Sequence, residues 1–220
     1  MRKGKVFIVS GPSGSGKGTI VKGVVAQKGN IYLSTSWTTR MPRNNEAHGV
    51  EYFFVSFEEF EEMKKKDGFL EWATYKTGDS YGTIAEPVYD ALDKGMDVIL
   101  EIDVQGALMV KEKIPDAILI MLTPPDIVTL ERRLRSRKDN TPEETIQKRL
   151  SAASKEMLSL SEYDYHILNE DNMQEACMEL LHSIMCYEHT KNENGEENSK
   201  YKEAAEANRA KDKLYLVEKF

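Results

Sequence analysis

The chain has 220 residues, of which 40% are hydrophobic and 30% charged, so it is long enough to bury a core as one compact unit. Its 30 Lys and Arg side chains against 37 Asp and Glu give a net charge of −7, which argues against a general nucleic-acid-binding or anionic-membrane surface. We expect no transmembrane helix and no signal peptide, because the apolar runs are too short. Cys177 and Cys186 fall in one predicted helix at positions that cannot pair, which favours reduced thiols in a cytoplasmic protein.

Residues 6–9 form a short apolar, β-branched run that is typical of a buried strand. The segment GPSGSGKGT follows at residues 11–19 and fits the phosphate-binding pattern G-x-x-x-x-G-K ahead of a helix. In such a loop, backbone N–H groups and the helix N-terminus surround a polyphosphate, and Lys17 would reach the outer phosphates. The residue after the lysine is Gly18, where a hydroxyl for Mg²⁺ is usual. The hydroxyl comes at Thr19, so direct and water-mediated metal contact both stay open.

A short strand is expected at residues 31–33, and the segment 34–54 after it is rich in hydroxyls and cations. Arg40 and Arg43 flank Pro42, which favours extended or turn geometry between them. Two neighbouring guanidinium groups suit a dianionic phosphate, since each donates two charge-assisted hydrogen bonds. The alternative is a pair of solvated loop arginines.

Residues 51–55 are predicted as a strand, and Ser56 with Glu59 forms a capping box that begins a helix at 57–66. Residues 69–75 alternate as a strand does, with Glu71 among them, and a turn at 78–79 leads into residues 80–83. These elements predict a small antiparallel subdomain.

A helix at 87–94 is expected to end at Gly95, and residues 97–102 are predicted as a buried strand. Glu101 and Asp103 follow at its carboxyl end, before a helix at 105–113. Ligands bind at this end of the strands in α/β sheets, so both carboxylates are candidates to lie near Mg²⁺ or the acceptor. The alternative for Asp103 is a simple helix cap.

After a strand at 117–122, Asp126 is expected to cap an arginine-rich helix, and Pro142 to occupy the first position of the next helix. Arg133 and Arg137 share one face of the first helix, and Arg149 returns from the second. Such a helical hairpin can swing guanidinium groups over a phosphoryl group. A solvated, salt-bridged helix is the alternative.

A last core strand is expected at 164–168 and a helix at 173–187, which completes an α/β fold with a parallel five-stranded sheet flanked by helices. Residues 191–220 are much more polar, and we call them the tail. We expect a helix around 201–213 with little apolar face, and residues 214–220 to dock on the body or on a partner. Because the polar linker separates the tail from every motif above, deletion of residues 192–220 is expected to leave catalysis nearly unchanged.

Together these motifs resemble the bacterial-type guanylate kinases over roughly residues 5–187. The resemblance rests on the phosphate loop and on STSWTTRMPR, EYFF, FLEWA, YGT, LEIDVQGA, RRLRSR and KRLSAA. It implies a P-loop NTPase-type fold with an inserted antiparallel GMP-binding subdomain (34–83) and a helical lid (132–150) on a core of residues 1–33, 84–131 and 151–190. It also implies ATP-dependent phosphorylation of GMP, and of dGMP, to the diphosphate in purine nucleotide metabolism.

The resemblance carries three sets of site residues over to this chain. The expected ATP-binding residues are Gly11, Pro12, Ser13, Gly14, Ser15, Gly16, Lys17, Gly18, Thr19 and Asn169. The expected GMP-binding residues are Ser36, Arg40, Arg43, Tyr52, Glu71, Tyr81, Thr83, Glu101 and Asp103. The expected catalytic residues are Lys17, Arg40, Arg133, Arg137 and Arg149, with Thr19 as the candidate Mg²⁺ contact.

The chain departs from the family pattern at Asn45, where glycine is usual, and in the interval from Glu71 to Tyr81, which is one residue longer. We expect GMP or dGMP and ATP with Mg²⁺ as ligands, no nucleic acid and no membrane, and the sequence leaves monomer and homo-oligomer open. Two alternatives remain: another nucleoside monophosphate kinase, since GSGKGT also suits adenylate kinase, and a catalytically silent protein-binding module of the same fold. Glu71 argues against the first and Lys17 against the second.

Overall fold

The computed structural model describes residues 3–43, 46–75, 77–136, 141–191 and 196–220. Contacts divide the chain into unit 1 (Met1–Val6 and Asn30–Ala117) and unit 2 (Phe7–Gly29 and Ile118–Phe220). Unit 1 holds the residues expected to bind GMP, and unit 2 holds those expected to bind ATP. The predicted boundaries of core, subdomain, lid and tail follow the motifs and not contact density, so they stay predictions.

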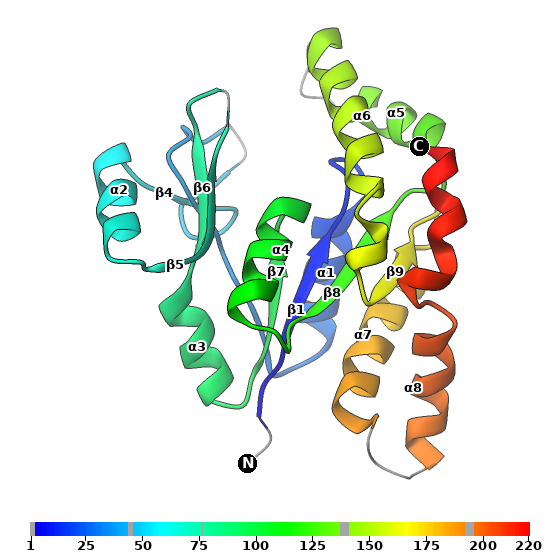
Figure 1. Cartoon of the computed structure of the whole chain (residues 1–220). Coiled ribbons are helices and arrows are strands. Elements are labelled where there is room, and N and C mark those ends of the chain that lie inside the picture. The colour runs from blue at the N-terminus through cyan, green and yellow to red at the C-terminus, as the bar shows by residue number, and fades with distance from the viewer. Residues whose placement is uncertain (1–2, 44–45, 76, 137–140, 192–195) are drawn as a thin grey trace. The chain divides into compact units, whose positions relative to one another are not determined.

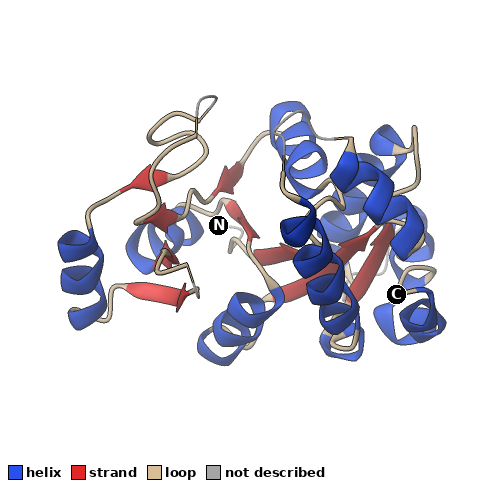
Figure 2. Cartoon of the chain, turned by 90° about the horizontal axis from the view of Figure 1, so that it is seen from above, coloured by secondary structure: helices blue, strands red, loops and turns tan. Residues whose placement is uncertain are grey.

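A five-stranded parallel sheet has the order β2-β7-β1-β8-β9, which confirms the predicted α/β architecture. Within unit 1, β2 pairs with β7 in parallel, and within unit 2, β8 pairs with β1 and β9 in parallel. Every residue of β1 and β8 is buried, as expected for strands covered on both faces, and helices lie on both sides of the strands in Figure 2. The strands are β1 (Val6–Ser10), β2 (Ile31–Leu33), β7 (Asp97–Glu101), β8 (Ile118–Thr123) and β9 (Tyr165–Leu168).

The smaller sheet of unit 1 has the order β4-β3-β6-β5 and is mixed, so the expectation of an antiparallel subdomain is only partly right. β6 pairs antiparallel with β3 and β5, but β3 and β4 run parallel. The chain between them, residues 39–52, is long enough for the crossover that a parallel pair needs. These strands are β3 (Trp37–Thr38), β4 (Phe53–Phe54), β5 (Phe69–Thr74) and β6 (Ser80–Ile84).

Local signals in the sequence set the start of α2 and the end of α3 in unit 1. Ser56 and Glu59 form the predicted capping box of α2 (Phe57–Lys65). α3 (Ala85–Asp93) ends at Gly95, whose φ is 74°, and the N–H groups of Gly95 and Met96 donate to the carbonyls of Leu92 and Ala91. The third helix of this unit is α4 (Val104–Lys113).

In unit 2, Asp126 caps α5 as predicted, because its carboxylate accepts the N–H of Thr129. Pro142, however, is the N-cap of α6 and not its first residue, since its ψ of 146° is extended. Its carbonyl accepts the N–H groups of Thr145 and Ile146. The helices of this unit are α1 (Lys17–Gln27), α5 (Ile127–Arg135), α6 (Glu143–Met157), the 3₁₀ turn η1 (Leu160–Glu162), α7 (Gln174–Thr190), α8 (Glu196–Glu206) and the 3₁₀ helix η2 (Ala210–Lys219).

The tail folds onto unit 2, and its helix ends earlier than expected, at Glu206, before η2 begins. Ala205 and Ala210 are fully buried and Leu216 is 2% exposed, so the tail has an apolar face that its composition obscured. Figure 1 shows α8 beside α7, and η2 (red) running from β9 toward α5. Cys177 and Cys186 both lie on α7 and are not joined by a disulfide. Among the described residues, no helix is long and apolar enough to cross a membrane.

Candidate functional site

The phosphate loop of unit 2 takes the shape that its glycines were expected to allow. Gly11 has φ 144° and a side chain there would lie 2.0 Å from the carbonyl oxygen of Leu122. Gly16 has φ 94° and caps α1 in the left-handed region, where a side chain would lie 2.5 Å from Nδ2 of Asn169. Only glycine fits both positions, and the loop therefore leads directly into the N-terminus of α1.

Lys17 folds back over the loop, where its ammonium donates to the carbonyl oxygens of Gly11 at 2.6 Å and Pro12 at 3.2 Å. The hydroxyl of Ser15 is fully buried and has no hydrogen-bond partner among the described residues. A buried hydroxyl without a partner is costly unless a ligand satisfies it. The loop thus offers an ammonium and a buried hydroxyl suited to a phosphate oxygen.

Asn169 follows β9 and braces the loop from the side. Its amide nitrogen donates to the carbonyl oxygen of Ser15 at 2.7 Å, and its backbone N–H donates to Thr123 at the end of β8. Asn169 is 3% exposed, so its side chain is held in place by the protein itself. Ser10, Thr123 and Leu168 end neighbouring strands at this edge of the sheet, where α/β folds bind ligands.

The lid arginines lie on the hairpin of α5 and α6. Arg133 donates to the carbonyl oxygen of Asn169 at 2.8 Å and to Asp171 at 2.9 Å, which ties α5 to the loop after β9. Arg133 and Arg132 hold the pKa of the Asp171 carboxyl below its ordinary value. Arg149 lies half-buried on α6, and Arg137 lies outside the described residues.

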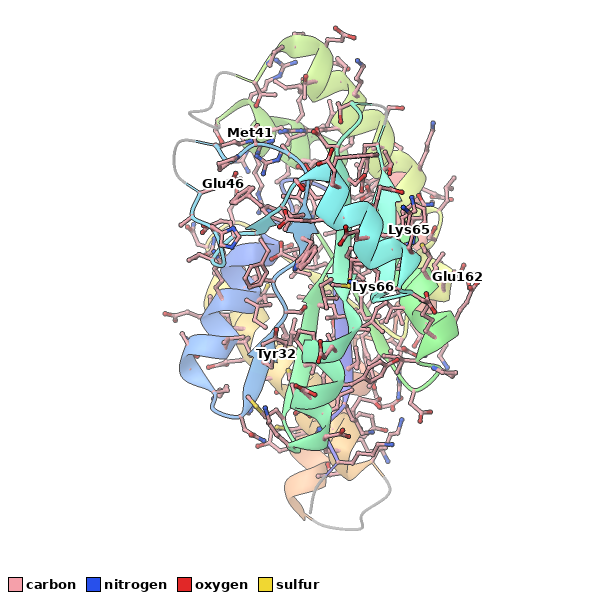
Figure 3. The ribbon with its side chains drawn as sticks, turned by 90° about the vertical axis from the view of Figure 1, so that its left-hand side faces the viewer. Tyr32, Met41, Glu46, Lys65, Lys66 and Glu162 are labelled. Carbon is pink, nitrogen blue, oxygen red and sulfur yellow. The ribbon has the colours of Figure 1, made fainter. Side chains whose placement is uncertain are left out.

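In unit 1, Arg40 is the centre of the expected phosphate-binding group. Its guanidinium donates to the hydroxyl of Tyr81 at 3.0 Å, to Glu46 at 3.0 Å and to the carbonyl of Met41 at 2.7 Å. The ring of Tyr52 lies 5.5 Å from the guanidinium carbon and edge-on to Tyr81. Arg40 lowers the pKa of Glu46, so this carboxylate is a charge partner of Arg40 within the loop. Figure 3 labels Glu46 and Met41 of this loop.

Arg43 and Ser36 are less engaged. The side chain of Arg43 is exposed, while its backbone N–H and carbonyl both bond to Glu46. Ser36 is half-buried, and its carbonyl accepts the N–H of Phe53. The predicted pair of guanidinium groups is therefore on one loop, and Glu46, which follows both arginines in sequence, bonds to the side chain of Arg40 and to the backbone of Arg43. Asn45 lies outside the described residues.

Glu71 is the most buried carboxylate of the expected base site. It is 7% exposed, and its Oε1 accepts the hydroxyl proton of Thr83 at 2.7 Å across the β5–β6 pair. Burial raises the pKa of Glu71 to about 7, with the charge of Asp103 acting in the same direction and the bond from Thr83 opposing it. A side chain on Gly106 would lie 2.9 Å from Oε2 of Glu71, so the glycine leaves room for this carboxylate.

Asp103 has two structural partners. Its Oδ1 caps α4 by accepting the N–H of Gly106 at 2.8 Å, which confirms the cap, and its Oδ2 accepts the hydroxyl proton of Tyr75. Burial and this bond raise the pKa of Tyr75, so its hydroxyl remains a donor. Glu101 ends β7, two residues earlier, and is half-buried.

Sequence reasoning missed several residues of these two groups, which are Glu46, Tyr75, Gly106 and Asp171. Each contacts an expected site residue across a loop or a helix turn. Gly106 was within the quoted LEIDVQGA motif, so its position was visible in the sequence but its nearness to Glu71 was not. Glu46, Tyr75 and Asp171 carry no local signal, because nothing in the neighbouring sequence distinguishes them from other charged or aromatic residues of loops.

The comparisons with known proteins identify the family of the chain. Residues 3–187 match the family model described as Guanylate kinase. The chain belongs to the guanylate kinase family.

Similar relatives and solved structures cover most of the chain. A guanylate kinase from Carboxydothermus hydrogenoformans is 46% identical over 171 residues, which covers 78% of this chain and 83% of that protein. One from Halalkalibacterium halodurans is 42% identical over 191 residues, covering 87% and 92%. The crystal structure of guanylate kinase from Anaplasma phagocytophilum matches with a TM-score of 0.69 at 29% identity and covers 86% of this chain and 87% of that one.

The hydroxyl residues of the phosphate loop are suited to a metal ion that binds together with a nucleotide. Among the described residues, no group of three or more His, Cys, Asp or Glu side chains is arranged to hold a metal ion by itself. Mg²⁺ commonly keeps several waters and shares substrate phosphates, so it needs few protein ligands. Thr19 is exposed on the first turn of α1 and Ser15 offers its buried hydroxyl, and both belong to the loop that would hold those phosphates.

Proposed function

We propose that this chain transfers the terminal phosphoryl group of ATP to GMP, and to dGMP, with the residue roles expected from the sequence. Glu71 carries the choice of GMP. It is a buried carboxylate beside the Thr83 hydroxyl, and a guanine edge presents two N–H donors that such an acceptor can bind. The phosphate loop and Lys17 support ATP as the donor.

No side chain needs to act as a base in this reaction, because the attacking group is a phosphate oxygen that is already ionised near neutral pH. Positioning and charge neutralisation then carry the catalysis. In the proposed mechanism the ammonium of Lys17 leaves the carbonyls of Gly11 and Pro12 for the donor phosphates. Arg133 and Arg149 neutralise charge on the transferred group, and Arg137 is proposed to join them.

On the acceptor side, Arg40 and Arg43 hold the GMP phosphate together with the hydroxyls of Tyr52 and Tyr81. For this role, Arg40 exchanges its bond with Glu46 for a bond with the phosphate. Because the side chains of Arg40 and Glu46 are each 14% exposed, the ion pair keeps the guanidinium placed before substrate binds. Glu71, Thr83, Asp103, Ser36 and Glu101 are proposed to surround the guanine.

Thr19 is the loop hydroxyl that we propose near Mg²⁺, directly or through water, and the buried hydroxyl of Ser15 is proposed to donate to a phosphate oxygen of ATP. When bound, the ion would neutralise charge on the phosphates of ATP. The protein's own part is to place the hydroxyls, and Gly18 contributes only backbone at the position after the lysine.

A coupled assay of ADP formation tests the proposal with GMP, dGMP and AMP as acceptors and without acceptor. We expect ADP only when an acceptor is present, with GMP preferred over AMP. Preference for AMP would support the adenylate kinase alternative, and tight GMP binding without ADP formation would support a silent binding module. Cys177 and Cys186 are not joined by a disulfide, which supports a reducing, cytoplasmic setting, and burial raises the pKa of the Cys177 thiol.

A further inference from the structure

The tail lies beyond the residues matched by the family model, yet it is tied to the sheet of unit 2. The N–H of His166 donates to the carbonyl of Asn208 at 2.8 Å, and the N–H of Ala210 donates to the carbonyl of Asp164 at 3.2 Å. Arg209 thereby forms an antiparallel bridge with Tyr165 of β9. Because β9 is the last strand in the order of the five-stranded sheet, the tail covers an edge that would otherwise present unpaired backbone groups.

Side chains reinforce this attachment. The guanidinium of Arg209 lies over the ring of Tyr165, 4.4 Å from its centre, and also donates to Glu206 at 3.0 Å. Glu206 in turn accepts the hydroxyl proton of Tyr187 on α7 at 2.8 Å. Residues 206–210 are therefore an anchor that joins the tail to β9 and α7.

From this anchor, η2 leads to the lid hairpin. Phe220 packs against a cluster formed by Leu130 and Leu134 of α5 and Ile146 and Ala153 of α6. The hydroxyl of Ser154 on α6 donates to the backbone oxygen of Phe220 at 2.6 Å. The tail thus contacts the apolar seam between the two helices that carry Arg133 and Arg149, and Figure 1 shows its end beside α5.

We propose that the tail is a strut in which Phe220 is a positioning residue for the lid arginines. Anchored on β9, it holds the α5–α6 hairpin so that Arg133 and Arg149 are placed for ATP. This inference rests on the proposed function for its kinetic consequence, but the positioning itself is a property of the protein without ligand. It also replaces the expectation that the tail is separated from the active assembly.

The test compares Phe220→Ala with Leu214→Ala, which removes a 43%-exposed apolar side chain from the same 3₁₀ helix outside the lid cluster. Hydrogen–deuterium exchange without nucleotide should speed up by about threefold to tenfold in α5 and α6 of the first variant. The second variant should exchange like the parent. Unchanged exchange in Phe220→Ala, or equal acceleration in both variants, would overturn the proposal.

The kinetic arm measures KM for ATP and for GMP separately. Phe220→Ala should raise KM for ATP by about threefold to tenfold, with KM for GMP within about twofold of the parent, and Phe220→Leu should restore most of the loss. A lower melting temperature with unchanged KM for ATP would mean that Phe220 serves stability alone, against the proposal. If the parent chain forms no ADP from ATP and GMP, the proposed function fails, and the exchange arm still decides whether the strut exists.

Discussion

The residues expected to bind ATP, on unit 2, and those expected to bind GMP, on unit 1, are two groups of different construction, which we call the ATP half and the GMP half. The ATP half on unit 2 is mainly backbone: glycines with positive φ, the N-terminus of α1, and Lys17 resting on two loop carbonyls. The GMP half on unit 1 is mainly side chains that already bond to one another, such as Arg40 with Glu46 and Glu71 with Thr83. Phosphates are shared by all nucleotides and need only N–H groups and cations, whereas a base is distinguished by donors and acceptors at fixed positions.

This difference has an energetic consequence. A phosphate loop made of backbone groups, which we call the cradle, keeps its shape when one side chain is removed. Substitutions there should therefore remove charge from the site and leave the fold intact. In the GMP half the most buried polar side chains are partners of one another, as Arg40 is of Glu46 and Glu71 is of Thr83, and removing one leaves the other unsatisfied or displaced. Substitutions there should change selectivity as well as rate.

Lys17→Ala tests the cradle and should have the largest effect. We expect kcat to fall by about 100-fold or more, because a group that stabilises charge in the transition state is lost. GMP binding measured by calorimetry and the melting temperature should stay near the parent values. Lys22→Ala, which removes an exposed lysine on the same helix, serves as the control. A parent-like kcat in folded Lys17→Ala would contradict the assigned role.

Glu71→Gln tests the GMP half. The amide cannot accept both guanine donors, so kcat/KM for GMP should fall by about 100-fold, and the ratio of GMP to AMP activity should narrow because the amide offers adenine N1 a donor. KM for ATP should stay unchanged. Glu86→Gln, at an exposed position on α3, is the matched control. Full GMP activity with the parent selectivity would move base recognition to Asp103.

The pH dependence of kcat/KM for GMP follows from the pKa of about 7 that burial gives Glu71. The carboxylate form accepts the guanine N–H donors and the protonated form does not, so activity should rise with pH. Between about pH 6 and about pH 8 the ionised fraction, and with it kcat/KM, should increase about tenfold. Titration of the GMP phosphate is common to all variants, so the comparison is with Glu71→Gln. An equally steep profile in that variant would assign the ionisation elsewhere.

Gly106→Ala should have the smallest of these effects and separates function from stability. The added Cβ would lie 2.9 Å from Oε2 of Glu71, and that carboxylate can swing away, so KM for GMP should rise about fivefold. The helix itself should gain stability by up to about 1 kcal/mol, since alanine is the better helix former. A melting curve checks the expected gain in stability, and a kinetic measurement checks the expected rise in KM for GMP. An unchanged KM would show that Glu71 tolerates the shift.

The phosphate loop, the helix caps at Ser56 and Asp126 and the end of α3 at Gly95 were all predicted from the sequence. Each depends on hydrogen bonds between residues only a few positions apart, so its physics is contained in a short segment. The buried strands were predicted for a similar reason, because continuous apolar runs such as β8 have few alternatives to a covered sheet. Helix ends were predicted less accurately: Pro142 was expected at the first position of α6 and is its N-cap.

Only the tertiary structure decided which distant residues meet. The parallel pairing of β3 with β4, the brace from Asn169 to Ser15, the place of Gly106 beside Glu71 and the attachment of the tail all join segments far apart in the chain. The tail is the clearest case, since its polar composition indicated a helix with little apolar face and left open whether residues 214–220 dock on the body or on a partner, whereas Ala205, Ala210 and Leu216 are buried in unit 2. Composition averages over a segment, but burial depends on which few side chains face a surface and on whether a strand edge is open to receive them.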